Sequence, residues 1–244
     1  MSSKNPWKDR VELLKAISSF TTRNGAFFIQ NAKRMSDLFE MSVYNDVVKF
    51  YRRKKYSIKI CNLMKDGTFK YKLSTAGLKG NFSYFEAKKT RRKKVVDSVE
   101  IHHNVSLQSS HDTHMYYTAD VSVCVEDAVI TTPQANGRNH SYIDSENLIT
   151  FFEVKNMNPF PSVLFSFSGI VLEIKPNFIT STTIPIGLNM KHLTPSIVFS
   201  GTGNQHAERI SDKLSSRYGY NVIRGLYANK GMIYSMKKLN TYDF

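Results

Sequence analysis

The residues best suited to chemistry stand where an apolar stretch ends. In NLITFFEVKN, residues 147–156, the run closes on Glu153, Val154 and Lys155. Successive side chains of a β-strand point to opposite faces, so Glu153 and Lys155 share one face while Val154 points the other way. Because the strand's other outward residues are apolar, we expect the pair at a sheet edge or in a cleft. There the acid can bind a divalent cation, and the lysine can assist a water or neutralise a phosphate oxygen.

A second acid lies on another apolar segment upstream. Asp120 stands in YYTADVSVC, residues 116–124, at the start or middle of a predicted strand. If the two strands are neighbours, Asp120 and Glu153 converge on one spot. Two close carboxylates repel each other unless a cation sits between them, and hard oxygen ligands of this type suit Mg²⁺ or Mn²⁺. The pattern therefore predicts a divalent-metal site.

A third acid falls on the apolar face of a predicted helix, residues 35–55. At about 100° per residue, that face consists of Val43, Tyr44, Val47, Val48 and Tyr51. Glu40 lies on the same face. A carboxylate there is costly unless it is paired or binds a metal ion, so Glu40 joins the candidate site.

The tripeptide Glu-x-Lys is a weak motif, because about two copies are expected by chance in a chain of this composition. The main competitor is Glu86-Ala-Lys88, which also ends a predicted strand but has no upstream acid comparable to Asp120. Glu173-Ile-Lys175 is predicted on a helix, where residues two apart do not share a face, so we expect these two side chains to be solvated or capping. For Glu153 and Lys155 the structural alternative is a surface salt bridge, with Asp120 as a turn residue at the start of its strand.

Hydrophobic periodicity predicts the elements that must position these acids. Helical spacing marks residues 7–20 as well as 35–55, and from Ser57 the period changes to two. The predicted strands are residues 56–63, 68–73, 81–88, 98–108, 115–125 and 148–155. Between the last two strands, Thr131–Ser145 must be an excursion.

The C-terminal part has a different pattern. Residues 162–175 follow Pro-x-Pro and predict a buried helix. Residues 195–201, 204–219 and 220–227 then predict strand, helix and strand, which indicates a β-α-β unit.

Helix-borne Glu40, then Asp120 on a strand, then Glu153-Val154-Lys155 on the next, resembles the PD-(D/E)xK nuclease superfamily. That superfamily includes many restriction endonucleases and Holliday-junction resolvases, and its core runs helix, three strands, helix, strand. The proline that names the motif is absent, since Ala119 precedes Asp120.

The resemblance implies a role for each residue. Asp120 and Glu153 would bind Mg²⁺ or Mn²⁺, with the carbonyl of Val154 completing the shell. Lys155 would assist the attacking water, and Glu40 would bind or orient a second metal ion or a water. The implied activity is hydrolysis of phosphodiester bonds in DNA, and less often RNA.

The resemblance also implies an α/β fold with a restriction-endonuclease-like core, in which helices flank a mixed central β-sheet. We expect an N-terminal helical extension over residues 1–34 and one nuclease domain over residues 35–244, with the βαβ unit at its end.

The charge favours a polyanionic partner. The chain of 244 residues has a formal net charge of +14 and a pI of about 9.7, which suggests nucleic acid or an anionic surface. Two basic clusters supply candidate phosphate contacts: Lys88, Lys89, Arg91, Arg92, Lys93 and Lys94 in one, and Arg52 and Arg53 in the other. The alternative for each residue is a solvated charged loop.

Other signals count for less. Two cysteines, Cys61 and Cys124, imply no disulfide framework and exclude a cysteine-based zinc site. His111-x-x-His114 lacks further zinc ligands, and Gly201–Asn204 is better read as a tight turn before a helix than as a phosphate loop. The polar N-terminus lacks a signal peptide's apolar core, and no segment is apolar and long enough to span a membrane, so we expect a cytoplasmic protein.

The sequence thus predicts a metal-dependent DNA endonuclease, fit for a restriction or anti-phage defence system. It would work with a partner subunit or as a homodimer. Two alternatives stay open: a basic DNA-binding subunit that cuts nothing, and an interaction module whose basic face docks an acidic protein.

Overall fold

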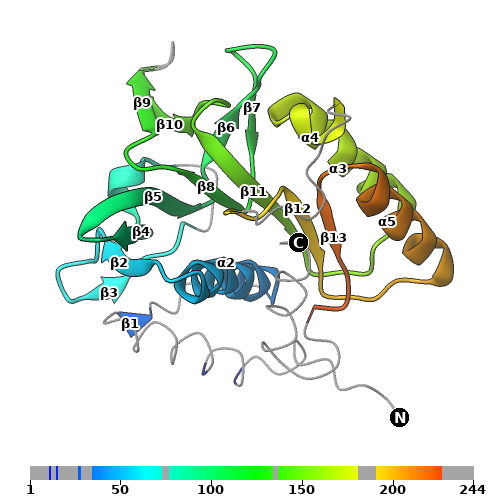
Figure 1. The fold of residues 1–244 in the computed structure, drawn as a ribbon, viewed down its shortest axis with the longest axis horizontal. Coiled ribbons are helices and arrows are strands. Elements are labelled where there is room, and N and C mark those ends of the chain that lie inside the picture. Colours follow the sequence, from blue (N-terminus) through cyan, green and yellow to red (C-terminus); the bar gives the residue numbers. More distant parts are fainter. Residues whose placement is uncertain are drawn as a thin grey trace.

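The computed structural model describes residues 35–72, 77–133, 137–180 and 191–226, together with residues 11, 15 and 27–28. The chain folds into a mixed α/β arrangement in which helices flank a central mixed sheet (Figure 1). The strands are β1 (Phe27–Phe28), β2 (Ser57–Cys61), β3 (Thr68–Phe69), β4 (Tyr84–Arg91), β5 (Lys94–His103), β6 (Ser106–Gln108), β7 (Tyr116–Thr118), β8 (Val121–Val125), β9 (Val129–Pro133), β10 (Asn139–Ile143), β11 (Leu148–Lys155), β12 (Ser196–Phe199) and β13 (Asn221–Ile223). The helices are α2 (Met35–Arg53), the 3₁₀ turn η2 (Lys79–Asn81), α3 (Pro161–Ile174), α4 (Asn177–Thr180) and α5 (Gln205–Arg217).

The central sheet has the strand order β13-β12-β11-β8-β5-β4-β2. Strands β2, β4, β5, β8 and β11 are antiparallel neighbours, whereas β11, β12 and β13 are parallel. Parallel neighbours need a crossover, which α3 provides between β11 and β12 and α5 between β12 and β13. The predicted C-terminal β-α-β unit is confirmed.

Each face of the central sheet covers its own core. On one face α2 packs against residues such as Val121, Val123 and Phe152. On the other, α3 and α5 pack against residues such as Phe151 and Phe199. The alternation of Phe151 and Phe152 follows from the two-residue period of a strand.

A second sheet, of order β7-β6-β10-β9, stands beside the central one. Its strands β9 and β10 form an antiparallel hairpin, in which Tyr142 pairs with Ile130. This hairpin is the excursion predicted between residues 131 and 145.

The helix predictions hold where the structure describes them. The predicted stripe of α2, from Val43 to Tyr51, is buried, and so are Phe39 and Phe50, so α2 is enclosed on more than one side. Helix α3 begins at Pro161, which suits the first turn because proline has no N–H to donate.

Three expectations need comment. The predicted helix over residues 7–20 lies largely outside the described residues. Within the expected N-terminal extension, β1 pairs in parallel with β3. The strand predicted over residues 68–73 is much shorter, Thr68–Phe69. Among the residues that the structure describes, no helix combines the length and the apolar character needed to cross a membrane.

Candidate active site

The end of β11 meets the start of β8 at the candidate site. Phe152 pairs with Val121 across the two antiparallel strands, so Glu153 lies next to Asp120, which immediately precedes β8. The backbone N–H of Val154 donates to Oδ2 of Asp120 at 2.6 Å. Strands β8 and β11 are therefore neighbours, as predicted. The single strand expected over residues 115–125 is wrong, because it is divided into β7 and β8 in different sheets, and Asp120 lies in the bend just before β8. Of the two expected settings, a sheet edge or a cleft, the edge is excluded, because β11 lies between β8 and β12 and the pair stands at the end of an internal strand.

Glu153 and Lys155 share a face of β11. Val154 points the other way, into the core under α2, with 3% of its surface exposed. The Lys155 ammonium contacts Oε1 of Glu153 in an ion pair. Because Glu153 is only 8% exposed, this pair differs from the surface salt bridge of the structural alternative.

Glu40 reaches the same region from α2, and its pKa is raised to about 7. Burial is the main cause, Asp37 adds to it, and Lys155 opposes it. The pKa of Asp120 is raised to about 8, first by burial and then by the charges of Glu153 and Glu40. Burial lowers the pKa of Lys155, but Glu153 and Asp120 outweigh burial and raise it. The structure thus gathers several acids around one lysine, an arrangement that lacks positive charge.

A hard divalent cation fits this set of donors. The carboxylates of Glu40, Asp120 and Glu153 stand too far apart to form a cluster of ligand atoms within 4.8 Å of one another. Mg²⁺ does not need three of them, because it usually binds through one or two carboxylates and keeps several waters. Asp120 and Glu153, on adjacent strands, are the pair that would hold the ion, with Glu40 as an outer acid.

The sequence reasoning missed Tyr117, whose hydroxyl donates a hydrogen bond to Oε2 of Glu153. Tyr117 belongs to β7 in the second sheet, so this contact ties that sheet to the candidate site. Both oxygens of Glu153 are therefore engaged, one by Lys155 and one by Tyr117. No residue spacing in the sequence indicated this contact, because it joins two different sheets.

His103 was also missed as a neighbour of the site. Its Nδ1 lies 2.6 Å from the carbonyl oxygen of Lys72, which can only accept, so Nδ1 carries the proton. Its Nε2 is buried, has no hydrogen-bond partner among the described residues and lies 3.9 Å from Oε2 of Glu40. Burial lowers the pKa of His103 to about 4, so the ring is neutral. The sequence placed His103 inside a strand predicted over residues 98–108, whereas β5 ends at His103, so the pattern gave no sign that His103 lies near the acids.

The competing Glu86-Ala-Lys88 motif forms a different arrangement. The Lys88 ammonium lies 2.5 Å from Oε1 of Glu126 and 3.3 Å from Oε1 of Glu86. This is an ion-pair chain at the protein surface. No buried group of acids surrounds it in the described part of the chain, and Lys88 is the member of its basic cluster that is already neutralised.

The third Glu-x-Lys motif lies at the end of α3, as predicted, and Lys175 is the C-cap residue of that helix. Glu173 is half-buried and accepts a hydrogen bond from the Ser109 hydroxyl, so it is not simply solvated. Lys175 is also half-buried, and its ammonium donates to the carbonyl of Ser145 at 3.0 Å.

One buried cluster was not foreseen. Ligand atoms of Glu100, His102 and Cys124 lie within 4.8 Å of one another. The Lys79 ammonium sits 2.9 and 2.7 Å from the two oxygens of Glu100, and His102 Nε2 is 2.8 Å from one of them. A cation already neutralises the carboxylate, so the cluster is best described as a buried ion-pair network. His111 and His114 are exposed and take no part in it.

The Gly201–Asn204 stretch is a turn into α5, as predicted. Asn204 caps the helix by accepting from the N–H of Ala207 at 2.9 Å. Gly203 has φ +78°, a left-handed conformation that favours glycine.

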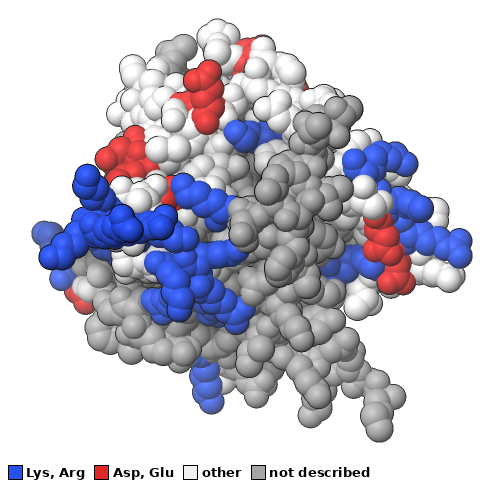
Figure 2. Space-filling model, in the orientation of Figure 1, with Lys and Arg blue, Asp and Glu red and all other residues white. Residues whose placement is uncertain are grey.

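The basic cluster forms a hairpin between β4 and β5. Arg91 pairs with Lys94, which leaves Arg92 and Lys93 as a two-residue turn with φ 49° and 65°. Such turns usually contain Asn-Gly, so bulky basic residues are placed here at a conformational cost. Figure 2 shows Lys and Arg gathered on the side where Figure 1 places β4, β5 and the last turn of α2, which carries Arg52 and Arg53.

The hairpin and the acids lie at opposite ends of β5. The turn precedes Lys94, whereas His103 at the other end pairs with Val121, next to Asp120. The strand between them is about 30 Å long, at about 3.4 Å per residue. The basic hairpin therefore does not line the acidic site.

No family model, no curated protein and no solved structure matches this chain.

Proposed function

We propose that this chain is a divalent-metal-dependent nuclease of restriction-endonuclease-like type that hydrolyses phosphodiester bonds in DNA. One observation carries the proposal. Glu40, Asp120 and Glu153 approach from α2, the start of β8 and the end of β11. Burial raises the pKa of Glu40 and of Asp120, and neighbouring acids raise both further. Folding gains nothing from gathering acids in this way, so their arrangement points to a cation that the fold is built to hold.

The order of elements supports the same proposal. The superfamily core runs helix, three strands, helix, strand. Here α2 is followed by β5, β8 and β11, which are adjacent in the sheet, and then by α3 and β12. Additions to this core are β2, β3 and β4 before β5, β6 and β7 before β8, and β9 and β10 before β11. Glu40 on α2, Asp120 just before β8 and Glu153 on β11 follow one another in the order of the motif, which supports the proposal.

Each residue has a separate task in the proposed reaction. A divalent ion bound by Asp120 and Glu153 would supply charge for the phosphate oxygens and a nucleophilic water. Lys155, kept cationic by its acidic neighbours, would orient that water and neutralise charge developing on phosphate. The hydrogen bond from Val154 fixes the Asp120 carboxylate, and Tyr117 fixes that of Glu153.

The charge of the chain supports a nucleic-acid substrate. Arg91, Arg92, Lys93 and Lys94 are all exposed on the hairpin, away from the repulsive acids. Contacts of this kind bind the phosphate backbone without reading bases and weaken as salt rises. Duplex DNA lying along β5 would reach both the hairpin and the site.

A plasmid-nicking assay with Mg²⁺ or Mn²⁺ tests the proposal. We expect the wild type to nick supercoiled DNA, and Glu153→Ala and Lys155→Ala to lose at least a hundredfold in rate. The matched control is Glu86→Ala, which breaks the other strand-borne Glu-x-Lys pair, keeps the basic cluster intact and should leave nicking nearly unchanged. Equal cutting by every variant would locate the activity elsewhere.

The basic hairpin favours one second candidate, a DNA-binding subunit that does not cut. The strained turn at Arg92 and Lys93 serves binding whether or not the acids catalyse anything. Salt-dependent DNA binding by all variants, without metal-dependent cleavage by any, would select this candidate.

A further inference from the structure

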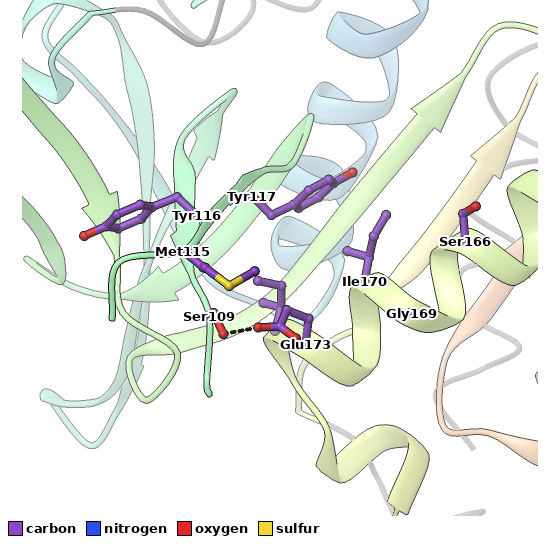
Figure 3. Close-up of a pocket in the computed structure, with 9 residues that line it drawn as sticks. Ser109, Met115, Tyr116, Tyr117, Ser166, Gly169, Ile170 and Glu173 are labelled. Carbon is purple, nitrogen blue, oxygen red and sulfur yellow. Dashed lines mark hydrogen bonds between the residues drawn. The ribbon is translucent and has the colours of Figure 1, made fainter. Parts of the chain in front are cut away.

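A pocket of about 440 Å³ opens between β7 and α3, beside the candidate active site (Figure 3). Tyr117 lines it from β7, Met115 from the loop just before β7, and Gly169 and Ile170 from α3. Its polar lining includes Glu173. A volume of this size accommodates a small flat ligand of nucleoside dimensions.

Hydrogen bonds already hold the floor of the pocket in place. Ser109 donates its hydroxyl hydrogen to Oε1 of Glu173, and the backbone N–H of Ser110 donates to the Glu173 carbonyl at 3.0 Å. The Ser110 hydroxyl donates to the same carbonyl at 2.8 Å, and His111 Nε2 lies 3.2 Å from the carbonyl of Leu172. These contacts hold the β6–β7 loop against the last turn of α3, whose carbonyls would otherwise lack partners. The pocket thus needs little rearrangement to receive a ligand.

Gly169 is an unexplained residue in its wall. A glycine in a helix interior destabilises by about 1 kcal/mol relative to alanine. A Cβ at this position would meet no atom within 4 Å among those the structure describes, so packing within this part of the chain does not require glycine. The glycine leaves the helix backbone open to the pocket, as an approaching ligand would require.

Tyr117 joins the pocket to the acids. Its ring lines the pocket while its hydroxyl donates to Glu153, so one side chain separates the two. Tyr116, the next residue, points away from α3 (Figure 3), in keeping with the alternation along a strand. A nucleotide whose phosphate lies at Glu153 and Asp120 would therefore direct its base towards the pocket.

We propose that this pocket binds the base of a nucleotide adjacent to the phosphate that is cut. The proposal rests on the nuclease function proposed above. The base would stack on Tyr117 and contact Met115 and Ile170, with the backbone at Gly169 beneath it. Ser109 donates to Oε1 of Glu173, whereas Oε2 has no hydrogen-bond partner among the residues that the structure describes, so Oε2 would accept from an exocyclic amino group of the base.

A second copy of the chain is the competing occupant. Helix α3 also carries Phe165 and Leu172, whose exposed fractions are 55% and 43%. These apolar side chains would suit a contact with a helix of a second copy. The link from Tyr117 to Glu153 favours a nucleotide, because a docked helix would make no use of it.

The test compares Gly169→Leu with the wild type. Leucine at residue 169 fills the pocket, and its backbone geometry suits a helix. The matched control is Ser162→Leu, an exposed position on the same helix two turns away and outside the pocket. The substrates are an oligonucleotide cut at one main position and copies carrying one abasic residue at successive positions around the cut.

We expect the wild type to lose about tenfold or more in kcat/KM when one particular position next to the cut is abasic. Gly169→Leu should already have this lower kcat/KM on the intact substrate, and its kcat/KM should not fall further on the substrate that is abasic at that position. Ser162→Leu should behave as wild type on both substrates. Equal cleavage of all abasic substrates, or wild-type kinetics for Gly169→Leu, would overturn the pocket proposal while leaving the nuclease function standing.

A binding measurement keeps the two proposals separable if no protein cuts. Binding of deoxynucleoside 5′-monophosphates is followed by NMR, without metal. Binding by wild type and Ser162→Leu but not Gly169→Leu would retain the pocket and remove the nuclease function. The proposal would be overturned if no protein binds nucleotide and the wild type is a dimer that the Gly169→Leu substitution dissociates. This surface would then be an interface between copies of the chain.

Discussion

The backbone N–H of Val154 donates to Oδ2 of Asp120 at 2.6 Å, which joins the end of β11 to the start of β8. This bond holds Asp120 beside Glu153, and the pKa of Asp120 is raised first by burial and then by the charge of Glu153. The backbone thus keeps two repelling carboxylates together. Among the described residues, Lys155 is the cation that offsets this repulsion. The predictions below follow from this arrangement and from the basic hairpin at the other end of β5.

Removing one acid should stabilise the protein in the absence of metal. In Asp120→Asn the side-chain oxygen still accepts from Val154, but the negative charge beside Glu153 is gone. We expect an increase of about 1 kcal/mol or more in the free energy of unfolding in EDTA at pH 8. Mg²⁺ should raise the Tm of the wild type but not of this variant.

Glu146→Gln is the control for that experiment, because Glu146 is exposed and distant in sequence from the acids. Its Tm should match the wild type with and without Mg²⁺. A loss of stability in Asp120→Asn, with the Mg²⁺ shift retained, would mean that Asp120 has a structural role only.

Tyr117→Phe should release one oxygen of Glu153. The buried carboxylate then loses a hydrogen-bond donor, which costs about 1–3 kcal/mol of folding stability. We expect the nicking rate to fall about tenfold, since Glu153 is no longer held in one orientation. Single-turnover kinetics at saturating enzyme measures that rate apart from DNA binding, and an unchanged rate would exclude Tyr117 from positioning Glu153.

The hairpin turn should trade stability for binding. Replacing Arg92 and Lys93 by Asn and Gly gives the turn the residues that tolerate positive φ, so we expect about 1 kcal/mol or more of added stability. The variant should bind DNA less tightly, with the slope of log K against log salt reduced by about 2. Chemical denaturation and salt-dependent fluorescence anisotropy measure the two effects. If the variant gains stability but binds DNA as tightly as the wild type, the turn does not contact DNA.

Duplex length should matter in a defined way. The distance along β5 of about 30 Å corresponds to about nine base pairs at about 3.4 Å per step. We expect affinity to drop sharply for duplexes too short to reach from the acids to the hairpin. The affinity of the Arg92→Asn, Lys93→Gly variant should not depend on duplex length in this way. Affinities of both proteins for a series of duplexes of increasing length test this, and the same drop in both would contradict it.

The ion-pair network at Glu100 should give a pH-dependent contribution. Burial raises the pKa of Glu100, but His102 and Lys79 outweigh burial and lower it to about 2. The group binds fewer protons folded than unfolded, so its contribution is complete above its unfolded value of about 4.5 and is lost as pH falls towards 2. Lys79→Met should cost about 3 kcal/mol at pH 7, and the difference from wild type should shrink below pH 4.

Lys88→Met provides the comparison, because its ion pair with Glu126 is exposed and should contribute little at any pH. Urea unfolding between pH 3 and 7, within the range where both variants fold, gives the differences. A constant cost for Lys79→Met across that range would remove Glu100 as the titrating group.

The sequence predicted what local periodicity determines. The two-residue period placed Glu153 and Lys155 on one face and Val154 on the other, and the 3.6-residue period placed Glu40 on the buried face of α2. The order of the strands could not be predicted. The predicted site required β8 and β11 to be neighbours, and the sequence could state this only as a condition. Whether they are depends on tertiary packing, which leaves no local trace in the chain.

Contacts between distant elements could not be predicted. Tyr117 reaches Glu153 from the other sheet, and Glu173 joins Ser109 instead of facing solvent. Glu100, His102 and Cys124 converge because β5 and β8 pair in one register, with Glu100 opposite Cys124. The sequence revealed the basic cluster of residues 88–94, but not that it forms a hairpin or that β5 separates that hairpin from the acids.

The location of bound Mn²⁺ tests the central claim most directly. Anomalous diffraction from crystals soaked in Mn²⁺ distinguishes the acids from the buried cluster of Glu100, His102 and Cys124. We predict a peak between the carboxylates of Asp120 and Glu153, lost in Asp120→Asn crystals. A peak at Glu100 instead, or none at Asp120 in the presence of saturating Mn²⁺, would contradict the account.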